Sequence, residues 1–147
     1  MVHGKAGRSS EMETDRDIPG LVRLLSRHAV AETIDRLEAD LRRRNIMVFA
    51  RIDFSGDAAR AGLRMQAEQM LIFGNPKAGT PLMLQVPAVG LDLPLKVLAW
   101  EDSDARVWVA YNDPEYVVRR YGLESALAAN IAAAIPVIEA AAGADSN

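Results

Sequence analysis

The sequence contains no cysteine among its 147 residues. It therefore forms no disulfide bond and offers no thiolate as a metal ligand or nucleophile, and the cytoplasm is the expected compartment. Histidine is nearly absent, because His3 and His28 are the only two. A Ser-His-acid triad would have to use His28, and no Gly-x-Ser-x-Gly motif occurs. Serine-type catalysis, a bound transition metal and a cofactor are therefore not expected.

Long apolar runs are also missing. No stretch approaches the roughly 18 consecutive apolar residues that a membrane helix needs, and the first residues lack the apolar core of a signal peptide. The formal net charge is −3, which argues against general nucleic-acid binding. We therefore expect neither a membrane nor a nucleic acid as a partner.

The residues that are present suit one globular domain, since 50% are hydrophobic and 25% are charged. Residues 1–17 mix charges with glycine and serine and show no apolar period, so we expect a disordered N-terminal tail. The folded domain is expected over residues 18–143, followed by a short tail over 144–147.

Apolar spacing predicts the elements of this domain. Val30, Ile34, Leu37 and Leu41 recur every three or four residues, which predicts an amphipathic helix. Five strands are predicted over residues 21–25, 46–54, 66–73, 95–100 and 106–111. A short turn is expected near residues 58–62, a short helix capped by Thr80 after residue 80, and C-terminal helices from Asp113 and from about Glu124, the last bent at Pro136.

Hairpin-length links between consecutive strands predict a largely antiparallel sheet. The order is a strand, a helix, four strands and a C-terminal helix, with short helical inserts between strands. We therefore expect an α+β fold with helices packed on one face of the sheet. The acidic link between the last two strands, which holds Asp102 and Asp104, lacks the spacing and the glycine of an EF-hand, so we expect a solvated loop.

The segment from Gly74 to Thr80 superficially resembles a phosphate-binding loop. A Walker A motif needs lysine directly before its final Ser or Thr, but Gly79 holds that position, so triphosphate hydrolysis is excluded. The segment still leads from a strand into a helix N-terminus, where an anion is favoured. Asn75, Lys77 and Thr80 are therefore candidate ligands for a small anion or carboxylate; the alternative is a purely structural turn.

Asp53 is the fourth candidate binding residue. It ends the second strand, and it would act as a general base if it faced the same cleft as Asn75. It would lie near Asn75 only if the second and third strands pair. The alternative is that its carboxylate caps the turn that follows.

Several segments resemble the bacterial and archaeal family called domain of unknown function 302, over roughly residues 20–142. The most specific are Phe73-Gly74-Asn75-Pro76-Lys77 and Asp92-Leu93-Pro94-Leu95-Lys96. The resemblance implies a β-α-β4-α arrangement similar to TATA-box-binding-protein-like folds, usually as a homodimer, and it implies no activity.

This chain departs from the family pattern at two places. The family commonly reads Asp-His after the second strand, but here Asp53 is followed by Phe54, which argues against histidine-dependent chemistry. The family commonly has serine at the start of the first helix, where this chain has Ala29. That change removes the capping box that Glu32 would complete.

Three functions are compatible with these residues. A small-molecule binding or sensing module is favoured, because the sequence lacks a reactive nucleophile and a convincing general base. The alternatives are an enzyme that uses Asp53 and Asn75, and a structural homodimeric adaptor. A homodimer is expected because an open sheet leaves edges to be covered and because the hairpin with Trp100 and Trp108 offers apolar contact area.

Overall fold

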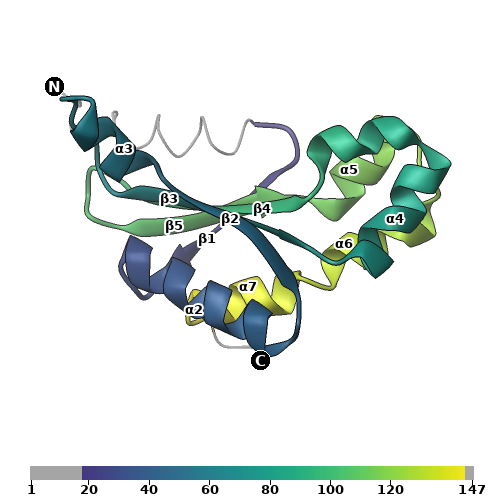
Figure 1. The fold of residues 1–147 in the computed structure, drawn as a ribbon, viewed down its shortest axis with the longest axis horizontal. Helices are drawn as coiled ribbons and strands as arrows, with labels where there is room; N and C mark the ends of the chain where they lie inside the picture. The colour runs from purple at the N-terminus through teal and green to yellow at the C-terminus, as the bar shows by residue number, and fades with distance from the viewer. Residues whose placement is uncertain (1–17, 145–147) are drawn as a thin grey trace, which may run out of the picture.

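The structure is a computed structural model that describes residues 18–144. The expected N-terminal tail, and residues 145–147 of the expected C-terminal tail, lie outside the described residues. Five strands form one sheet in the order β1-β5-β4-β3-β2, and each neighbouring pair is antiparallel (Figure 1). They are β1 (Leu21–Ser26), β2 (Met47–Asp53), β3 (Glu68–Gly74), β4 (Leu95–Glu101) and β5 (Val107–Asn112). The predicted α+β class and its five strands are confirmed.

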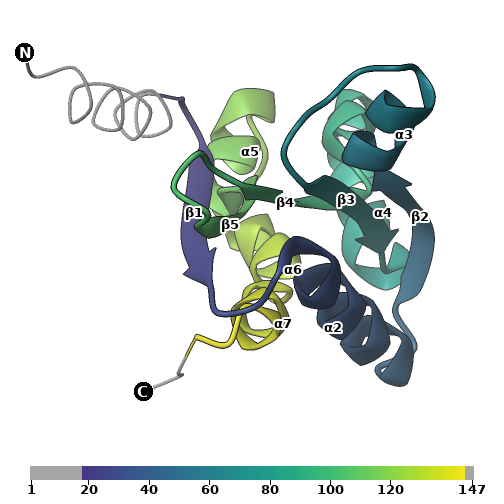
Figure 2. The same ribbon diagram turned by 90° about the vertical axis from the view of Figure 1, so that its left-hand side faces the viewer.

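Two helices cover one face of this sheet, α2 (Val30–Arg43) and α7 (Ile135–Ala141), and they lie side by side (Figures 1 and 2). The apolar stripe that predicted α2 is buried, with Ile34, Leu37 and Leu41 at most 1% exposed. It packs against strand side chains that include Leu71, Phe73, Val97 and Val109. Burial of this stripe against the sheet stabilises the fold.

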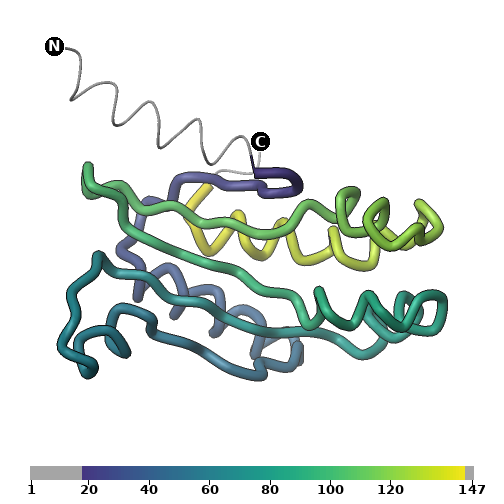
Figure 3. The backbone as a smooth tube through the Cα atoms, turned by 90° about the horizontal axis from the view of Figure 1, so that it is seen from above, coloured from purple at the N-terminus to yellow at the C-terminus, as the bar shows by residue number. Residues whose placement is uncertain are grey.

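The remaining helices lie mostly at one end of the sheet, where β3 and β5 run directly into them (Figures 1 and 3). They are α4 (Pro76–Gln85), the 3-10 helix η1 (Pro87–Asp92), α5 (Pro114–Tyr121), the 3-10 helix η2 (Ser125–Leu127) and α6 (Ala128–Ala132). They enclose a second apolar core around Leu82, Val89 and Val117. The helical inserts are therefore more than connections, since together they form a layer with its own core.

Helix boundaries are where the sequence-based expectations were wrong. The helix expected to start at Thr80 begins five residues earlier, with Asn75 as N-cap and Pro76 in the first turn, and Pro81 is tolerated inside it. The turn expected near residue 58 is α3 (Phe54–Arg60), capped by Asp53. The single helix expected from Glu124 is divided, and Pro136 lies in the first turn of α7, where its missing N–H costs no hydrogen bond.

The hairpin between β4 and β5 was expected to carry a solvated acidic loop, but Asp102 is only 4% exposed. Its carboxylate accepts hydrogen bonds from Trp108 Nε1 and from Arg106 Nε, both at 2.8 Å, and from the backbone N–H groups of Asp104 and Arg106 at 2.9 Å. Burial alone would raise the pKa of Asp102, but these donors lower it from 3.8 to about 2. Asp102 therefore holds the two sides of the hairpin together from inside.

The stabilisation that the Asp102 carboxylate contributes depends on pH, and this dependence can be measured. A carboxyl whose pKa is lower in the folded protein stabilises the fold above its unfolded value, and this stabilisation is lost as the pH falls from 3.8 to about 2. The free energy of unfolding of the wild type should therefore fall by about 2 kcal/mol more than that of Asp102→Asn over this window. Urea titrations at several pH values measure it. Asp57→Asn, which changes an exposed carboxylate, is the control, and equal slopes for the wild type and Asp102→Asn would contradict the assignment.

Candidate ligand-binding pocket

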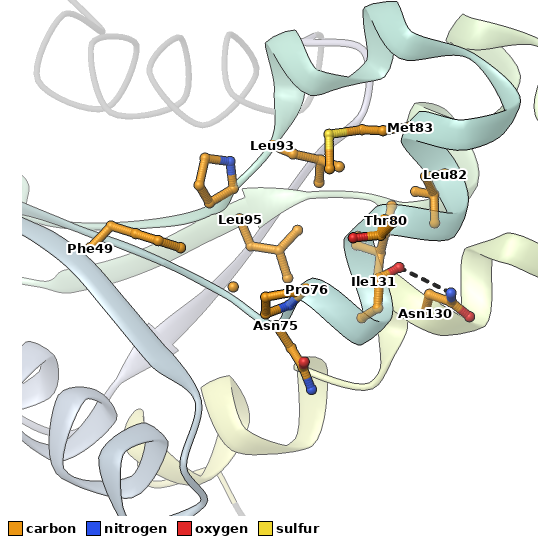
Figure 4. A pocket seen from close by; sticks show the side chains of 14 residues that line it. Phe49, Asn75, Pro76, Thr80, Leu82, Met83, Leu93, Leu95, Asn130 and Ile131 are labelled. Carbon is orange, nitrogen blue, oxygen red and sulfur yellow. Dashed lines mark hydrogen bonds between the residues drawn. The ribbon is translucent and has the colours of Figure 1, made fainter.

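A pocket of about 300 Å³ lies where the end of the sheet meets α4 and α6 (Figure 4). Its walls come from β2, the junction between β3 and α4, the segment that leads into β4, and α6. All of its lining residues are uncharged and most are apolar: Phe49, Gly74, Asn75, Pro76, Ala78, Gly79, Thr80, Leu82, Met83, Leu93, Pro94, Leu95, Asn130 and Ile131. Concave, mainly apolar surfaces of this size are typical of small-molecule sites.

Strand pairing positions two walls of the pocket. Phe73 of β3 is paired with Leu95 of β4, so the end of β3 and the start of β4 lie side by side. A Cβ on Gly74 would lie 3.4 Å from Pro94 Cβ and 3.5 Å from Phe49 Cε2. Both distances are ordinary van der Waals contacts, so the two rings pack directly against the backbone at Gly74.

Phe49 reaches the pocket because of an irregularity in β2. The register with β3 shifts between Val48 and Ala50, which indicates a β-bulge at Phe49. After the bulge, Arg51 faces α2, and its Nη1 lies 2.6 Å from Asp35 Oδ1. Phe49 itself is 52% exposed and forms one side of the pocket.

One hydrogen bond joins the walls contributed by α4 and α6. Asn130 Nδ2 of α6 donates to the carbonyl oxygen of Ala78 at 3.0 Å (Figure 4). The side chain of Thr80 turns its hydroxyl into the pocket, whereas the amide of Asn75 points away from it. The pocket therefore presents an apolar surface with one inward side-chain hydroxyl.

The structure brings only two of the four predicted binding residues to this pocket. Asn75 and Thr80 line it, and the exposed Lys77 does not. Strands β2 and β3 do pair, but their register sets Met47 opposite Gly74 and Asp53 opposite Gln69. Asp53 therefore lies at the other end of β2, about 20 Å away at the usual rise per residue.

Asp53 instead has a local structural role. Its Oδ1 accepts hydrogen bonds from the backbone N–H of Gly56 at 2.9 Å and from Ser55 Oγ at 2.8 Å. The hydrogen bond from Gly56, followed by that from Ser55, lowers the pKa of Asp53. The capping alternative is therefore what the structure shows, and a carboxylate stabilised in this way is a poor general base.

The start of α4 also has little to offer an anion. Pro76 has no N–H group, and the N–H of Lys77 donates to Asn75 Oδ1 at 3.0 Å. The N–H groups of Ala78 and Gly79 both donate to the carbonyl oxygen of Asn75 at 2.9 Å. The backbone donors that made this segment a candidate anion site already have partners within the chain.

Sequence reasoning missed the apolar lining, above all Phe49, Met83, Leu95 and Ile131. A signal was nonetheless present in the two segments that carried the family resemblance. The first contributes Gly74, Asn75 and Pro76 to the pocket, and the second contributes Leu93, Pro94 and Leu95. The two segments meet at this one place in the fold.

Three comparisons with known proteins bear on this fold. The chain is 45% identical over 104 residues to the "Fluoride-specific ion channel FluC 1" of Brucella suis biovar 1 (strain 1330), which covers 71% of this chain and 41% of the relative. "Fluoride-specific ion channel FluC 2" of Brucella melitensis biotype 1 (strain ATCC 23456 / CCUG 17765 / NCTC 10094 / 16M) matches at the same identity over 38% of its length. The chain thus spans about two fifths of the curated relatives that it matches. Across residues 18–144, no helix has the length and apolar character needed to cross a membrane.

A solved structure and a family model agree with each other. The crystal structure of an uncharacterized conserved protein DUF302 from Bacillus stearothermophilus superposes with a TM-score of 0.69 at 19% identity, and covers 86% of this chain and 98% of that one. That likeness establishes the fold. The family model described as "Domain of unknown function DUF302" matches residues 22–141. The expected resemblance is confirmed, and the chain belongs to the DUF302 family.

Proposed function

We propose that this chain is a small-molecule binding module whose ligand occupies the pocket between the end of the sheet, α4 and α6. The observation that carries the proposal is the pocket itself, which is about 300 Å³ in volume, mainly apolar and lined by both of the segments that mark the family. Phe49 and Met83 at the pocket are 52% and 37% exposed. A bound apolar ligand would remove part of this surface from water.

The lining favours binding over catalysis and a neutral ligand over an anion. All lining side chains are uncharged, and the candidate base Asp53 lies far from Asn75. The enzyme that would use these two residues together is therefore not supported by the geometry. Lys77 remains a candidate for attracting an anion at the surface, but it does not line the pocket.

Filling the pocket should abolish binding without unfolding the protein. Gly79 lies on α4, and a Cβ there would make ordinary contacts, 3.7 Å from Leu93 Cδ1 and 3.9 Å from Met83 Cε. Gly79→Leu should occupy the pocket and leave the melting temperature unchanged or higher, because glycine disfavours a helix. Methyl NMR titrations with 1-hexanol, cyclohexanol and benzyl alcohol measure binding, and we expect at least a tenfold loss of affinity.

The matched control is Lys77→Ala, a change on the same helix outside the pocket lining, which should bind like the wild type. Saturable shifts on the methyl groups of Leu95, Ile131 and Met83 would support the proposal. Shifts on another surface, or equal affinity for Gly79→Leu and the wild type, would overturn it.

The relatives suggest a second candidate, an accessory domain for a membrane ion-transport protein. A channel has to cross the membrane, and the described part of this chain holds no helix able to do so. In the Brucella proteins, the segment similar to this chain makes up about two fifths of the length. We propose that such a segment regulates transport, whereas the rest of the relative conducts the ion.

Proteoliposome efflux tests this second candidate. Removing the homologous segment from the Brucella suis protein should leave fluoride efflux measurable but change its rate, because the membrane-spanning part remains. Inserting this chain in its place should restore the original rate. An efflux rate that does not respond to removal of the segment would rule out a regulatory role.

The homodimer remains a proposal. Strands β1 and β2 are the edges of the sheet, and Met47 on β2 is 54% exposed. Trp108 offers less exposed apolar area for such a contact than the sequence suggested, because it is 8% exposed and lies beneath the guanidinium of Arg23, whose Cζ is 3.9 Å from the ring centroid.

Light scattering at micromolar concentration should give twice the 16.0 kDa of one chain. Met47→Lys should shift the mass towards one chain if the β2 edge carries the contact, because a charge on an edge strand opposes pairing. The exposed change Ala59→Ser on α3 is the control. A mass of 16.0 kDa at high protein concentration would contradict the dimer.

A further inference from the structure

Three side chains in the walls of the pocket contain rings, one of them aromatic. The phenyl ring of Phe49 approaches from β2, and the ring of Pro76 bounds the same space from the first turn of α4 (Figure 4). Pro94, in the segment before β4, also lines the pocket. Phe49 and Pro94 both converge on Gly74, where a Cβ would lie within 3.5 Å of each. Three ring systems from three separate segments therefore meet around one cavity.

Each asparagine at the pocket has one amide atom bonded within the chain. Asn75 uses its Oδ1 to cap α4, and Asn130 uses its Nδ2 to hold the carbonyl oxygen of Ala78. The hydroxyl of Thr80 points inward and has no hydrogen-bond partner assigned within the described residues. A ligand can therefore satisfy one hydrogen bond on the side of α4 while the rest of its surface stays apolar.

Size sets a further limit. A cavity of about 150 Å³ is enough to hold benzene. The pocket, at about 300 Å³, has room for one such ring with short substituents, and it lies at the low end of the range for small-molecule sites. The volume therefore admits a small aromatic ring, and it limits the ligand to about one or two rings.

We infer that the pocket binds a small, uncharged aromatic compound that carries one hydroxyl group, such as a simple phenol, with its ring against Phe49, Pro94 and Pro76 and its hydroxyl at Thr80. This inference rests on the proposed function, since it names the ligand class of the same pocket. Aromatic contact with Phe49 and sulfur–aromatic contact with Met83 favour a planar ring over a saturated ring of equal size.

Four matched probes distinguish selective binding of a phenol from unselective binding of apolar compounds. The probes are p-cresol, its saturated counterpart 4-methylcyclohexanol, toluene, which lacks the hydroxyl, and 4-methylbenzoate, which is charged. Methyl NMR titrations of the wild type should give p-cresol at least about fivefold tighter binding than 4-methylcyclohexanol, and tighter binding than toluene or 4-methylbenzoate.

Two variants assign this preference to particular side chains. Phe49→Leu should remove the advantage of p-cresol over 4-methylcyclohexanol, because it removes the aromatic face. Thr80→Val keeps the shape of the side chain and should reduce p-cresol binding to the level of toluene. Lys77→Ala should leave all four affinities unchanged.

Different results would contradict the proposed ligand class and the proposed binding module. Equal binding of p-cresol and 4-methylcyclohexanol in the wild type would overturn the aromatic class and leave the binding module standing. Tighter binding of 4-methylbenzoate would replace the neutral ligand by an anion and overturn the inference. No saturable shift at Leu95 or Ile131 with any of the four probes or with the aliphatic alcohols would refute the binding module itself.

Discussion

The antiparallel pairing of β3 with its two neighbours is the constraint on which the rest of the molecule depends. Because β3 is bordered by β2 and β4, its register sets which residues meet at each end of the sheet. At one end Gly74, Leu95 and α4 come together. At the other end Asp53 faces Gln69, far from any of them. A shift by one residue would exchange the two faces of the sheet and bury the wrong side chains.

The molecule has two apolar cores, one beneath the sheet and one among the helices at its end. The core beneath the sheet is formed by apolar side chains of the strands, of α2 and of α7, and it holds these two helices against one face of the sheet. The second core, around Leu82 and Val89, packs against α4. Leu82 and Ile131 belong both to this core and to the lining of the pocket, so the pocket walls rest on a packed layer.

Much of the fold follows from local pattern. The stripe from Val30 to Leu41 could be read from spacing alone, and so could the five strands, because half-buried elements repeat their contacts with a fixed period. The start of α4 could not, since Asn75-Pro76 and Thr80-Pro81 are both good caps followed by proline. The choice between them depends on where β3 ends, and strand pairing decides that.

The candidate site was less predictable than the fold. Lys77 and Asp53 were predicted to bind a ligand because they carry charge. The pocket is instead built from uncharged residues that come from four separate parts of the chain. The burial of Asp102 could not be predicted from the local sequence either, since its main side-chain partner, Trp108, lies across the hairpin. The family-like segments were the better guide, because they meet in space.

The direct passage from β3 into α4 has a mechanical consequence. Gly74 ends the strand, Asn75 caps the helix and Pro76 begins it, so no loose connection separates the pocket wall from the sheet. The hydrogen bond from Asn130 to Ala78 and the shared core around Leu82 and Ile131 join α4 to α6. Helix α6 is followed closely by α7, which packs against α2 beneath the sheet. The wall of the pocket is therefore continuous with β3 on one side and with α6 on the other, and a shift of α4 would have to be accommodated in both.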